Sequence, residues 1–277
     1  MAENRMRRIA NRVAELSEFE NLLRPSSSKR ILLVQGESES GKSILLEQFD
    51  IIARECGTIK TGCADFNGGL LLSELLYSLC GELGQSIFPL YTKSISRQEA
   101  VHIDLSANLA ESKFGDSNAI AINPVVQIPK GPALTASSAE QVGIFLQDLR
   151  NLRSIVLFII DSYDQATQDA ARWILMQLFP AIRTCPNLRI VIAGQSLPLP
   201  SNYKTTWGPY AVHKVLDQVT SIDDWHAFAM LYHPAFPRDY IELGCKGRLP
   251  ARPSVFHSYI ESIAKHLPPV PTKDGIK

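Results

Sequence analysis

Cysteine is scarce in this sequence, and its placement argues against a metal site or a disulfide framework. The five cysteines are odd in number and scattered among apolar residues. Neither they nor the six histidines show the CxxC or HxxxH spacings that many zinc sites use. We therefore expect the cysteines to be free thiols in a reducing compartment.

An excess of one charge and long apolar runs are also missing. Lysine plus arginine and aspartate plus glutamate both number 28, so no global field attracts the chain to nucleic acid or to an acidic membrane. No apolar run approaches the ~18 residues of a membrane-spanning helix. The N-terminal stretch MAENRMRRIANR lacks the apolar core of a secretory signal. We expect a soluble, cytoplasmic protein with no membrane partner.

The sequence does contain a regular alternation of apolar strands and amphipathic helices. Continuous apolar runs at 31–34 and 155–160, and an apolar run at 188–193 that is interrupted by Arg189, predict strands that are buried on both faces, as in a parallel sheet. The other elements predicted before residue 203 are a strand at 59–66 and helices at 6–24, 42–56, 70–83, 138–150 and 167–182. The alternation predicts an α/β fold built on a doubly wound parallel sheet.

The pattern changes after residue 203, which predicts a core followed by a small helical lid. In chain order, the expected parts are an N-terminal helix packed on the core at 1–27, the core at 28–204, the lid at 205–268 and a disordered tail at 269–277. Lid helices are predicted at 221–232 and 253–266. Short alternating stretches within 95–130 predict an irregular or β insertion in the core.

The strongest motif in the sequence is a phosphate-binding loop. It reads Gly36-Glu37-Ser38-Glu39-Ser40-Gly41-Lys42-Ser43, and it stands between a predicted strand and a predicted helix, as the GxxxxGKS pattern requires. Its glycines allow successive N–H groups to point at an anion, and the helix adds the positive end of its dipole. Lys42 is expected to reach the β- and γ-phosphates, and Ser43 to ligate Mg²⁺. We predict binding of ATP with Mg²⁺ by the whole loop and the adjoining Ile44.

Asp161 is the predicted second ligand of the metal. It ends an apolar strand, so its carboxylate emerges at the carboxyl edge of the sheet, where it holds Mg²⁺ through water. The alternative is an ordinary aspartate at the end of a strand. The acidic loop residues Glu37 and Glu39 are expected to point outward, because carboxylates that face the phosphates would repel them.

Hydrolysis requires a group that orients or deprotonates water, and two candidates follow the strands. Asp164 lies three residues after Asp161 and is predicted to be catalytic together with Lys42. The alternative is that Asp164 caps the helix that follows it. Gln195 comes directly after the strand that ends at Gly194, where a polar side chain senses the γ-phosphate or orients the water. Its alternative is an exposed loop residue.

Taken together, these motifs resemble the STAND-type signalling ATPases, which are relatives of AAA+ and NACHT proteins, over roughly residues 8–265. The run Ile9–Leu16 is similar to the family's pre-loop motif, in which an arginine-glutamate pair precedes a leucine-bearing helix. That similarity implies nucleotide contacts from Asn11 and Arg12. The run Ile155–Ala166 resembles the metal-binding strand, and the strand ending at Gly194 resembles the sensor strand. A different interpretation of Arg12, with three neighbouring arginines, is a solvated basic helix face.

Later segments resemble the family less specifically, and two positions depart from its pattern. The segments Val215–Asp217 and Gly247–Pro250 resemble parts of the helical lid. Gln195 stands where arginine is usual, and Asp164 stands where glutamate is usual. Both departures predict slow or partner-dependent hydrolysis without affecting binding. The resemblance implies a reduced form, since no winged-helix, repeat or effector domain is recognisable.

We therefore expect a nucleotide-dependent switch or assembly subunit in a bacterial defence or signalling complex. Its ATP and ADP states would be read by a protein partner that carries the effector or sensor function, and the resemblance implies a homo-oligomer. Two alternatives stay open, namely a non-hydrolysing ATP-binding scaffold and a nucleic-acid-dependent ATPase. The balanced charge argues against the second, because binding to nucleic acid depends on clustered basic residues.

Overall fold

A five-stranded sheet is the centre of the main domain. The computed structural model describes residues 12–84, 86–96, 138–246 and 253–268, and in these residues the strand order is β2-β3-β4-β1-β5. All neighbouring strands are parallel. In chain order the strands are β1 (Ile31–Gln35), β2 (Lys60–Asp65), β3 (Val156–Asp161), β4 (Leu188–Gly194) and β5 (Ala211–Val215). The predicted α/β class with a parallel sheet is confirmed.

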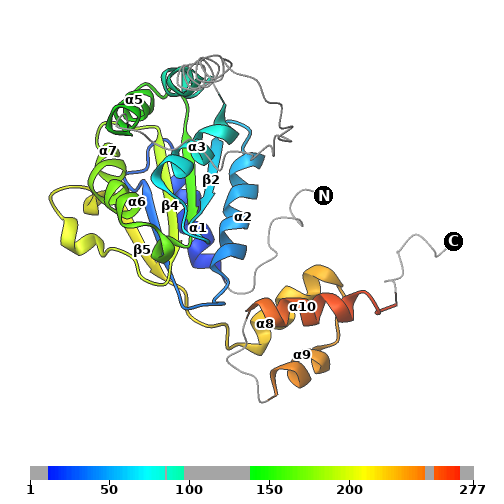
Figure 1. Cartoon of the computed structure of the whole chain (residues 1–277). Coiled ribbons are helices and arrows are strands. Elements are labelled where there is room, and N and C mark those ends of the chain that lie inside the picture. The colour runs from blue at the N-terminus through cyan, green and yellow to red at the C-terminus, as the bar shows by residue number, and fades with distance from the viewer. Residues whose placement is uncertain (1–11, 85, 97–137, 247–252, 269–277) are drawn as a thin grey trace, which may run out of the picture.

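Helices cover both faces of this sheet (Figure 1). One face packs against α1 (Val13–Leu23) and α2 (Lys42–Glu55). On the other face lie a helical segment at 89–96, α3 (Leu72–Leu83), α5 (Ser138–Arg150), α6 (Gln168–Trp173) and α7 (Phe179–Ala181). Side chains of β1 alternate between the two layers, with Leu33 on the second face and Leu32 on the first. Burial of both faces explains why the strand reads as an unbroken apolar run.

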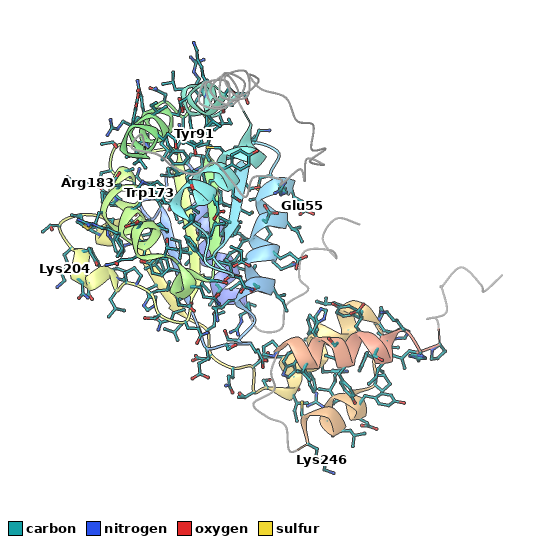
Figure 2. All side chains as sticks on the ribbon, viewed as in Figure 1. Glu55, Tyr91, Trp173, Arg183, Lys204 and Lys246 are labelled. Atoms are coloured by element: carbon teal, nitrogen blue, oxygen red, sulfur yellow. The ribbon has the colours of Figure 1, made fainter. Side chains whose placement is uncertain are left out.

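Aromatic residues fill much of the second layer. Phe145 of α5 stacks on Phe88 with 4.9 Å between the ring centroids, and it also contacts Phe158 of β3. Tyr91 and Trp173, both labelled in Figure 2, meet the same ring edge-on and are buried in this layer. Such pairs add about 0.5–1.5 kcal/mol each to the burial of their area, so this layer fixes the helices firmly to the sheet.

The helix predicted at 167–182 is interrupted. A π-helical turn at Ile174–Leu178 separates α6 from α7. Pro180 lies in the first turn of α7, where it has no N–H for the carbonyl four residues earlier and its ring crowds that carbonyl. The wider π-helical turn accommodates the missing hydrogen bond and the bulk of the proline ring. Pro180 therefore changes the local helical pitch, but the chain continues as a helix.

Strand β5 was not predicted from the sequence. It pairs with β1 in a register that runs from Ile31 opposite Ala211 to Gln35 opposite Val215. Because it is an edge strand, its residues are mostly half-buried, and its polar His213 breaks the apolar pattern that marks the central strands. The sheet therefore continues beyond the boundary predicted at residue 204, and the helical part begins later.

In the described residues after β5, three helices form a body beside the main domain (Figure 1), and we call this body the lid. They are α8 (Ile222–Tyr232), α9 (Arg238–Cys245) and α10 (Pro253–Ala264). The short α9 was not predicted. These helices share an apolar cluster that includes Trp225, Ile241 and Phe256, which is separate from the two clusters of the sheet. The lid thus has a core of its own.

Several sequence predictions fall outside the described residues. They concern the start of the helix predicted at 6–24, most of the insertion at 95–130, the segment Gly247–Pro250 and the tail at 269–277. Among the residues that are described, no helix combines the length and the apolar character needed to cross a lipid bilayer.

Candidate functional site

Residues that are distant in sequence meet at the carboxyl edge of the sheet. Strand β4 lies between β3 and β1, so Asp161, Gln195 and Gly36 follow or end three adjacent strands. The hydroxyl of Ser43 donates a hydrogen bond of 2.6 Å to Oδ2 of Asp161. The carboxyl edge at a change in strand order is where open α/β sheets bind ligands, and this is where the structure brings the predicted metal-binding pair together.

In the loop between β1 and α2, the side chain of Lys42 folds back onto the loop's own backbone carbonyls. Nζ of Lys42 donates to the carbonyl oxygens of Gly36 at 2.8 Å and of Glu37 at 2.7 Å. Burial lowers the pKa of Lys42, while the charges of Asp161 and Asp164 act in the opposite direction. Since α2 begins at Lys42, its free N–H groups lie at the same place and favour an anion.

The interior of the loop is too narrow for a side chain at its first glycine. A Cβ atom at Gly36 would lie 2.5 Å from Oγ of Ser40 and 3.2 Å from Cβ of Leu216. The Oγ atom of Ser40 is buried and has no hydrogen-bond partner among the described residues. Buried polar atoms in native proteins are usually paired, so an unpaired hydroxyl in a loop of backbone donors fits a site for a phosphate group.

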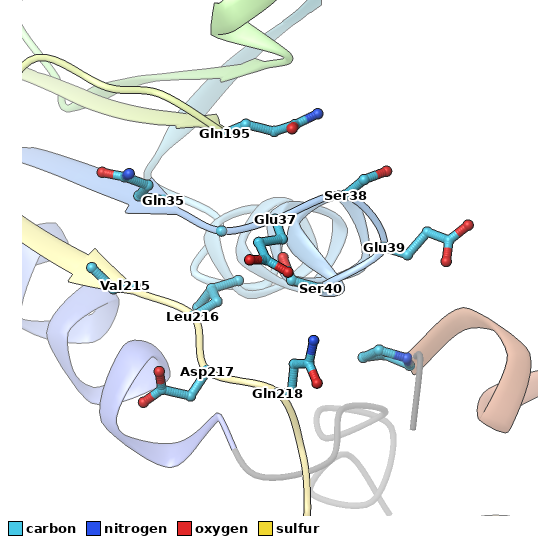
Figure 3. A pocket seen from close by; sticks show the side chains of 12 residues that line it. Gln35, Glu37, Ser38, Glu39, Ser40, Gln195, Val215, Leu216, Asp217 and Gln218 are labelled. Atoms are coloured by element: carbon cyan, nitrogen blue, oxygen red, sulfur yellow. The ribbon is translucent and has the colours of Figure 1, made fainter. Parts of the chain in front are cut away.

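Both acidic residues of the loop are exposed. The side chain of Glu39 extends away from the loop (Figure 3), which is the direction expected for it. Its backbone has a φ of 63°, a left-handed conformation that costs residues with a Cβ atom about 1–2 kcal/mol. The loop therefore holds local strain at the position where Glu39 stands.

Replacing Glu39 with glycine should produce a more stable protein than the matched Glu37→Gly variant. Glycine adopts positive φ without strain, whereas Glu37 is not among the residues with positive φ and its replacement adds only chain entropy to the unfolded state. We expect the free energies of unfolding in urea to differ by about 1–2 kcal/mol. Equal values for the two variants would show that Glu39 is not strained.

Asp164 is tied to the end of β4 rather than to the helix that follows it. Its Oδ1 accepts a hydrogen bond of 2.7 Å from the N–H of Gln195. The N-cap of α6 is Thr167, whose hydroxyl accepts from the N–H of Ala170 at 3.4 Å. The capping interpretation of Asp164 is therefore wrong, because another residue occupies that position. Two of the three predicted catalytic residues, Asp164 and Gln195, instead contact each other through the Gln195 N–H.

Asp161 is held by hydrogen bonds to both of its oxygens. Oδ1 accepts from the N–H of Ser162 at 2.7 Å, and Oδ2 accepts from Ser43. No cluster of three or more histidine, cysteine, aspartate or glutamate side chains suited to a metal occurs in the described part of the chain. One carboxylate with one hydroxyl suits Mg²⁺, which commonly takes few protein ligands and completes its shell with phosphate oxygens and water.

A pocket of about 550 Å³ opens beside the loop (Figure 3). Its lining comes from the loop, the end of β4, the linker after β5 and the first residue of α10, namely Gln35, Gly36, Glu37, Ser38, Glu39, Ser40, Gln195, Val215, Leu216, Asp217, Gln218 and Pro253. This volume is within the range of about 300–1,000 Å³ that is usual for small-molecule sites. Gln218 and Pro253 were not predicted to line the site, because a pocket shared by segments that are distant in sequence has no local sequence signal.

Arg12 is buried instead of lying on a solvated helix face, so that interpretation is wrong for this residue. Only 5% of its surface is exposed, and its Nη2 donates to the carbonyl oxygens of Ser40 at 3.1 Å and Asp217 at 2.8 Å. Its guanidinium also lies 3.9 Å from the carboxylate of Glu15, as in the predicted arginine-glutamate pair. Asn11 lies outside the described residues.

Comparisons with known proteins identify the fold. No protein-family model matches the chain, and no curated protein matches its sequence. Among solved structures, Cdc6p from Pyrobaculum aerophilum has 10% identity and a TM-score of 0.53, and the match covers 94% of this chain and 63% of that one. The ORC2 protein of Aeropyrum pernix, solved as ADPNP-ADP complexes, has 11% identity and a TM-score of 0.52, with 92% and 62% coverage.

A third match is Drosophila ORC bound to DNA, with 8% identity, a TM-score of 0.51, and coverage of 92% of this chain and 55% of that one. The chain thus spans between 55% and 63% of these three longer chains. At such low identity the similarity concerns the fold alone. Together with the five-stranded parallel sheet and the loop between β1 and α2, it shows an α/β fold of the P-loop NTPase kind.

Proposed function

We propose that this chain binds ATP with Mg²⁺ and acts as a nucleotide-dependent switch. The observation that carries the proposal is the 2.6 Å hydrogen bond from Ser43 to Asp161, which places a hydroxyl and a carboxylate together next to Lys42 at the start of a helix. Ser43 and Asp161 would hold Mg²⁺, and the ion would supply positive charge that neutralises the phosphates. The loop from Gly36 to Ser43 would hold the phosphates themselves.

The base and the sugar would occupy the pocket beside the loop. That pocket is lined both by loop residues and by Gln218 and Pro253, which belong to the linker and the lid. A ligand that fills it touches the core and the lid at once. Ligands shift a conformational equilibrium only through different contacts in the two states, and a triphosphate and a diphosphate would differ at this boundary.

We also propose a catalytic role for Asp164 and Gln195 and a cellular role for the chain. Asp164 would orient the attacking water, with Gln195 beside it. One oxygen of Asp164 already accepts a hydrogen bond from the Gln195 N–H, which supports slow turnover. The arginine-glutamate pair of Arg12 and Glu15 supports the STAND-type assignment. We propose a role in a bacterial defence or signalling complex, with a protein partner and self-assembly that depend on the nucleotide.

Calorimetric titration and phosphate release test this proposal together. Wild type should bind MgATP at one site and release phosphate slowly. Asp164→Asn keeps an oxygen that can accept from the Gln195 N–H, so we expect unchanged affinity and phosphate release slowed at least about tenfold, since a positioned acid or base contributes about 10²–10⁴-fold. Absence of MgATP binding to the wild type would refute the proposal.

Two other outcomes would change the assigned function rather than the binding site. Binding of MgATP with no phosphate release, even after addition of any protein that copurifies with the chain, would indicate a non-hydrolysing scaffold. The match to a DNA-bound ORC structure favours a second candidate, a nucleic-acid-dependent ATPase. Stimulation of phosphate release by DNA that falls steeply with added salt would support that candidate.

A further inference from the structure

The side chain of Arg12 connects two segments that border the pocket. A single nitrogen, Nη2, donates to the carbonyl of Ser40 in the loop and to the carbonyl of Asp217 in the linker that leads to the lid. These carbonyls are separated by more than 170 residues of sequence. Both bonds end on backbone atoms, so the contact depends on Arg12 and on the path of the chain rather than on the identity of its partners.

The bond to Ser40 fixes the orientation of a peptide unit in the loop. In a trans peptide the carbonyl of one residue and the N–H of the next point in opposite directions. Because Arg12 holds the carbonyl of Ser40 on its own side, the N–H of Gly41 points to the opposite side of the loop. Successive N–H groups oriented in this way form the nest that binds phosphate. Arg12 therefore sets one donor of the nest without touching the ligand.

The bond to Asp217 holds the linker at the point where it leaves the sheet. The N–H of Leu216 donates to the carbonyl of Gln35 at 2.7 Å, so it still belongs to the β5 ladder. Asp217 is the next residue, and Gln218 after it lines the pocket. Further along, the carbonyl of Val219 accepts from Nε1 of Trp225 in the lid core at 3.2 Å. The linker is thus attached to Arg12 at one end and to the lid at the other.

The position of Arg12 is fixed by the packing of α1 on α2. Arg12 is the N-cap residue of α1, and its carbonyl accepts from the N–H of Leu16 at 2.9 Å. Further along the helix, Phe19 stacks on Phe49 of α2 with 4.1 Å between the ring centroids. Since α2 is the helix that follows the loop, this packing of α1 on α2 positions the guanidinium relative to the loop.

We infer that Arg12 is a positioning residue that transmits nucleotide occupancy of the loop to the lid. A ligand phosphate that engages the Gly41 N–H orders the Ser40 peptide, the ordered carbonyl holds the guanidinium, and the guanidinium holds Asp217 and the linker. The inference rests on the proposed MgATP binding. It assigns Arg12 a position behind the loop, where it shapes the site and does not contact the nucleotide.

The test compares Arg12→Met with Glu15→Gln as the matched control. Methionine keeps much of the aliphatic volume and removes every donor, whereas Glu15→Gln leaves both carbonyl bonds in place. MgATP affinity is measured by calorimetry, and hydrogen exchange is measured at 215–219 and in α8 with and without saturating MgATP. We expect Arg12→Met to lose about tenfold or more in affinity, as for a lost hydrogen bond to a charged group, and to lose the MgATP-dependent protection. The control should resemble wild type.

Three results would overturn the inference. The first is wild-type affinity and wild-type protection in Arg12→Met. The second is weaker binding with full protection of the lid at saturating MgATP, which would show a merely structural role. If Arg12→Met fails to melt cooperatively, Arg12→Lys takes its place, because it keeps the charge without the reach of Nη2. The third result is that the wild type does not bind MgATP, which would reject the proposed function as well. The first two results reject the role of Arg12 alone.

Discussion

A Lys42→Ala variant should lose MgATP affinity by about 10- to 150-fold while it keeps its fold. The ammonium now binds two loop carbonyls, at 2.8 and 2.7 Å, so it is already at the mouth of the loop and needs only to exchange these oxygens for phosphate oxygens. A charge-assisted contact of this kind is worth about 1.5–3 kcal/mol, and the helix start beside Lys42 cannot replace it. Calorimetric titration with MgATP measures the loss directly.

The matched control for this variant is Lys60→Ala. Lys60 is exposed and begins β2, at the amino edge of the sheet and therefore at the end opposite the loop. Its removal changes the net charge by the same amount without touching the proposed site. Equal affinity for MgATP in Lys42→Ala and Lys60→Ala would refute the assignment of the loop as the phosphate site.

An Arg189→Met variant should be destabilised by about 3–5 kcal/mol, because it leaves several backbone carbonyls without their donor and each buried unsatisfied polar group costs about 1–3 kcal/mol. Arg189 is fully buried, and its guanidinium donates to the carbonyls of Leu22, Arg24, Pro186 and Leu188 at 2.6–3.0 Å. Two of these carbonyls belong to the end of α1, where a positive charge is favourable. Burial, and then the nearby Arg30, lower the pKa of Arg189 to about 10, so it remains charged at neutral pH.

Thermal unfolding followed by circular dichroism measures this effect. For a domain of this size, about 2–4 °C of melting temperature corresponds to each kcal/mol, so a decrease of about 10 °C is expected for Arg189→Met. Arg183→Met is the control, because its side chain lies at the surface (Figure 2). A change of less than about 1 kcal/mol in Arg189→Met would mean that methionine packs as well as the arginine network.

The central part of the fold was predictable because burial on both faces leaves a clear trace in sequence. Strands β1, β3 and β4 agree with the predicted runs to within one residue at each end. The phosphate-binding loop was recognisable because its glycines and Lys42 have fixed spacing. Asp161 followed from the same logic, since a polar residue that ends a buried strand emerges at the sheet edge.

What could not be predicted depends on contacts between distant segments. Strand β5 is half-exposed at an edge, so its sequence lacks the apolar run that marks a central strand. The buried position of Arg12 depends on backbone carbonyls at Ser40 and Asp217, and carbonyls leave no trace in a sequence. The hydrogen bond between Asp164 and the Gln195 N–H could not be predicted either, because it also involves a backbone group. The two residues were predicted separately as site residues.

The separate apolar cluster of the lid has a consequence for cooperativity. Trp225, Ile241 and Phe256 pack within the lid alone, and a helical body of this size buries too little area to be more than marginally stable by itself. Heating the ligand-free chain should therefore melt the lid first and the sheet domain later, as two heat-absorption peaks in calorimetry. A ligand that binds the native form of both bodies raises and merges these peaks. Because the lid is joined to β5 by a linker, we expect the chain to unfold in two steps without ligand and in one step when the ligand is bound.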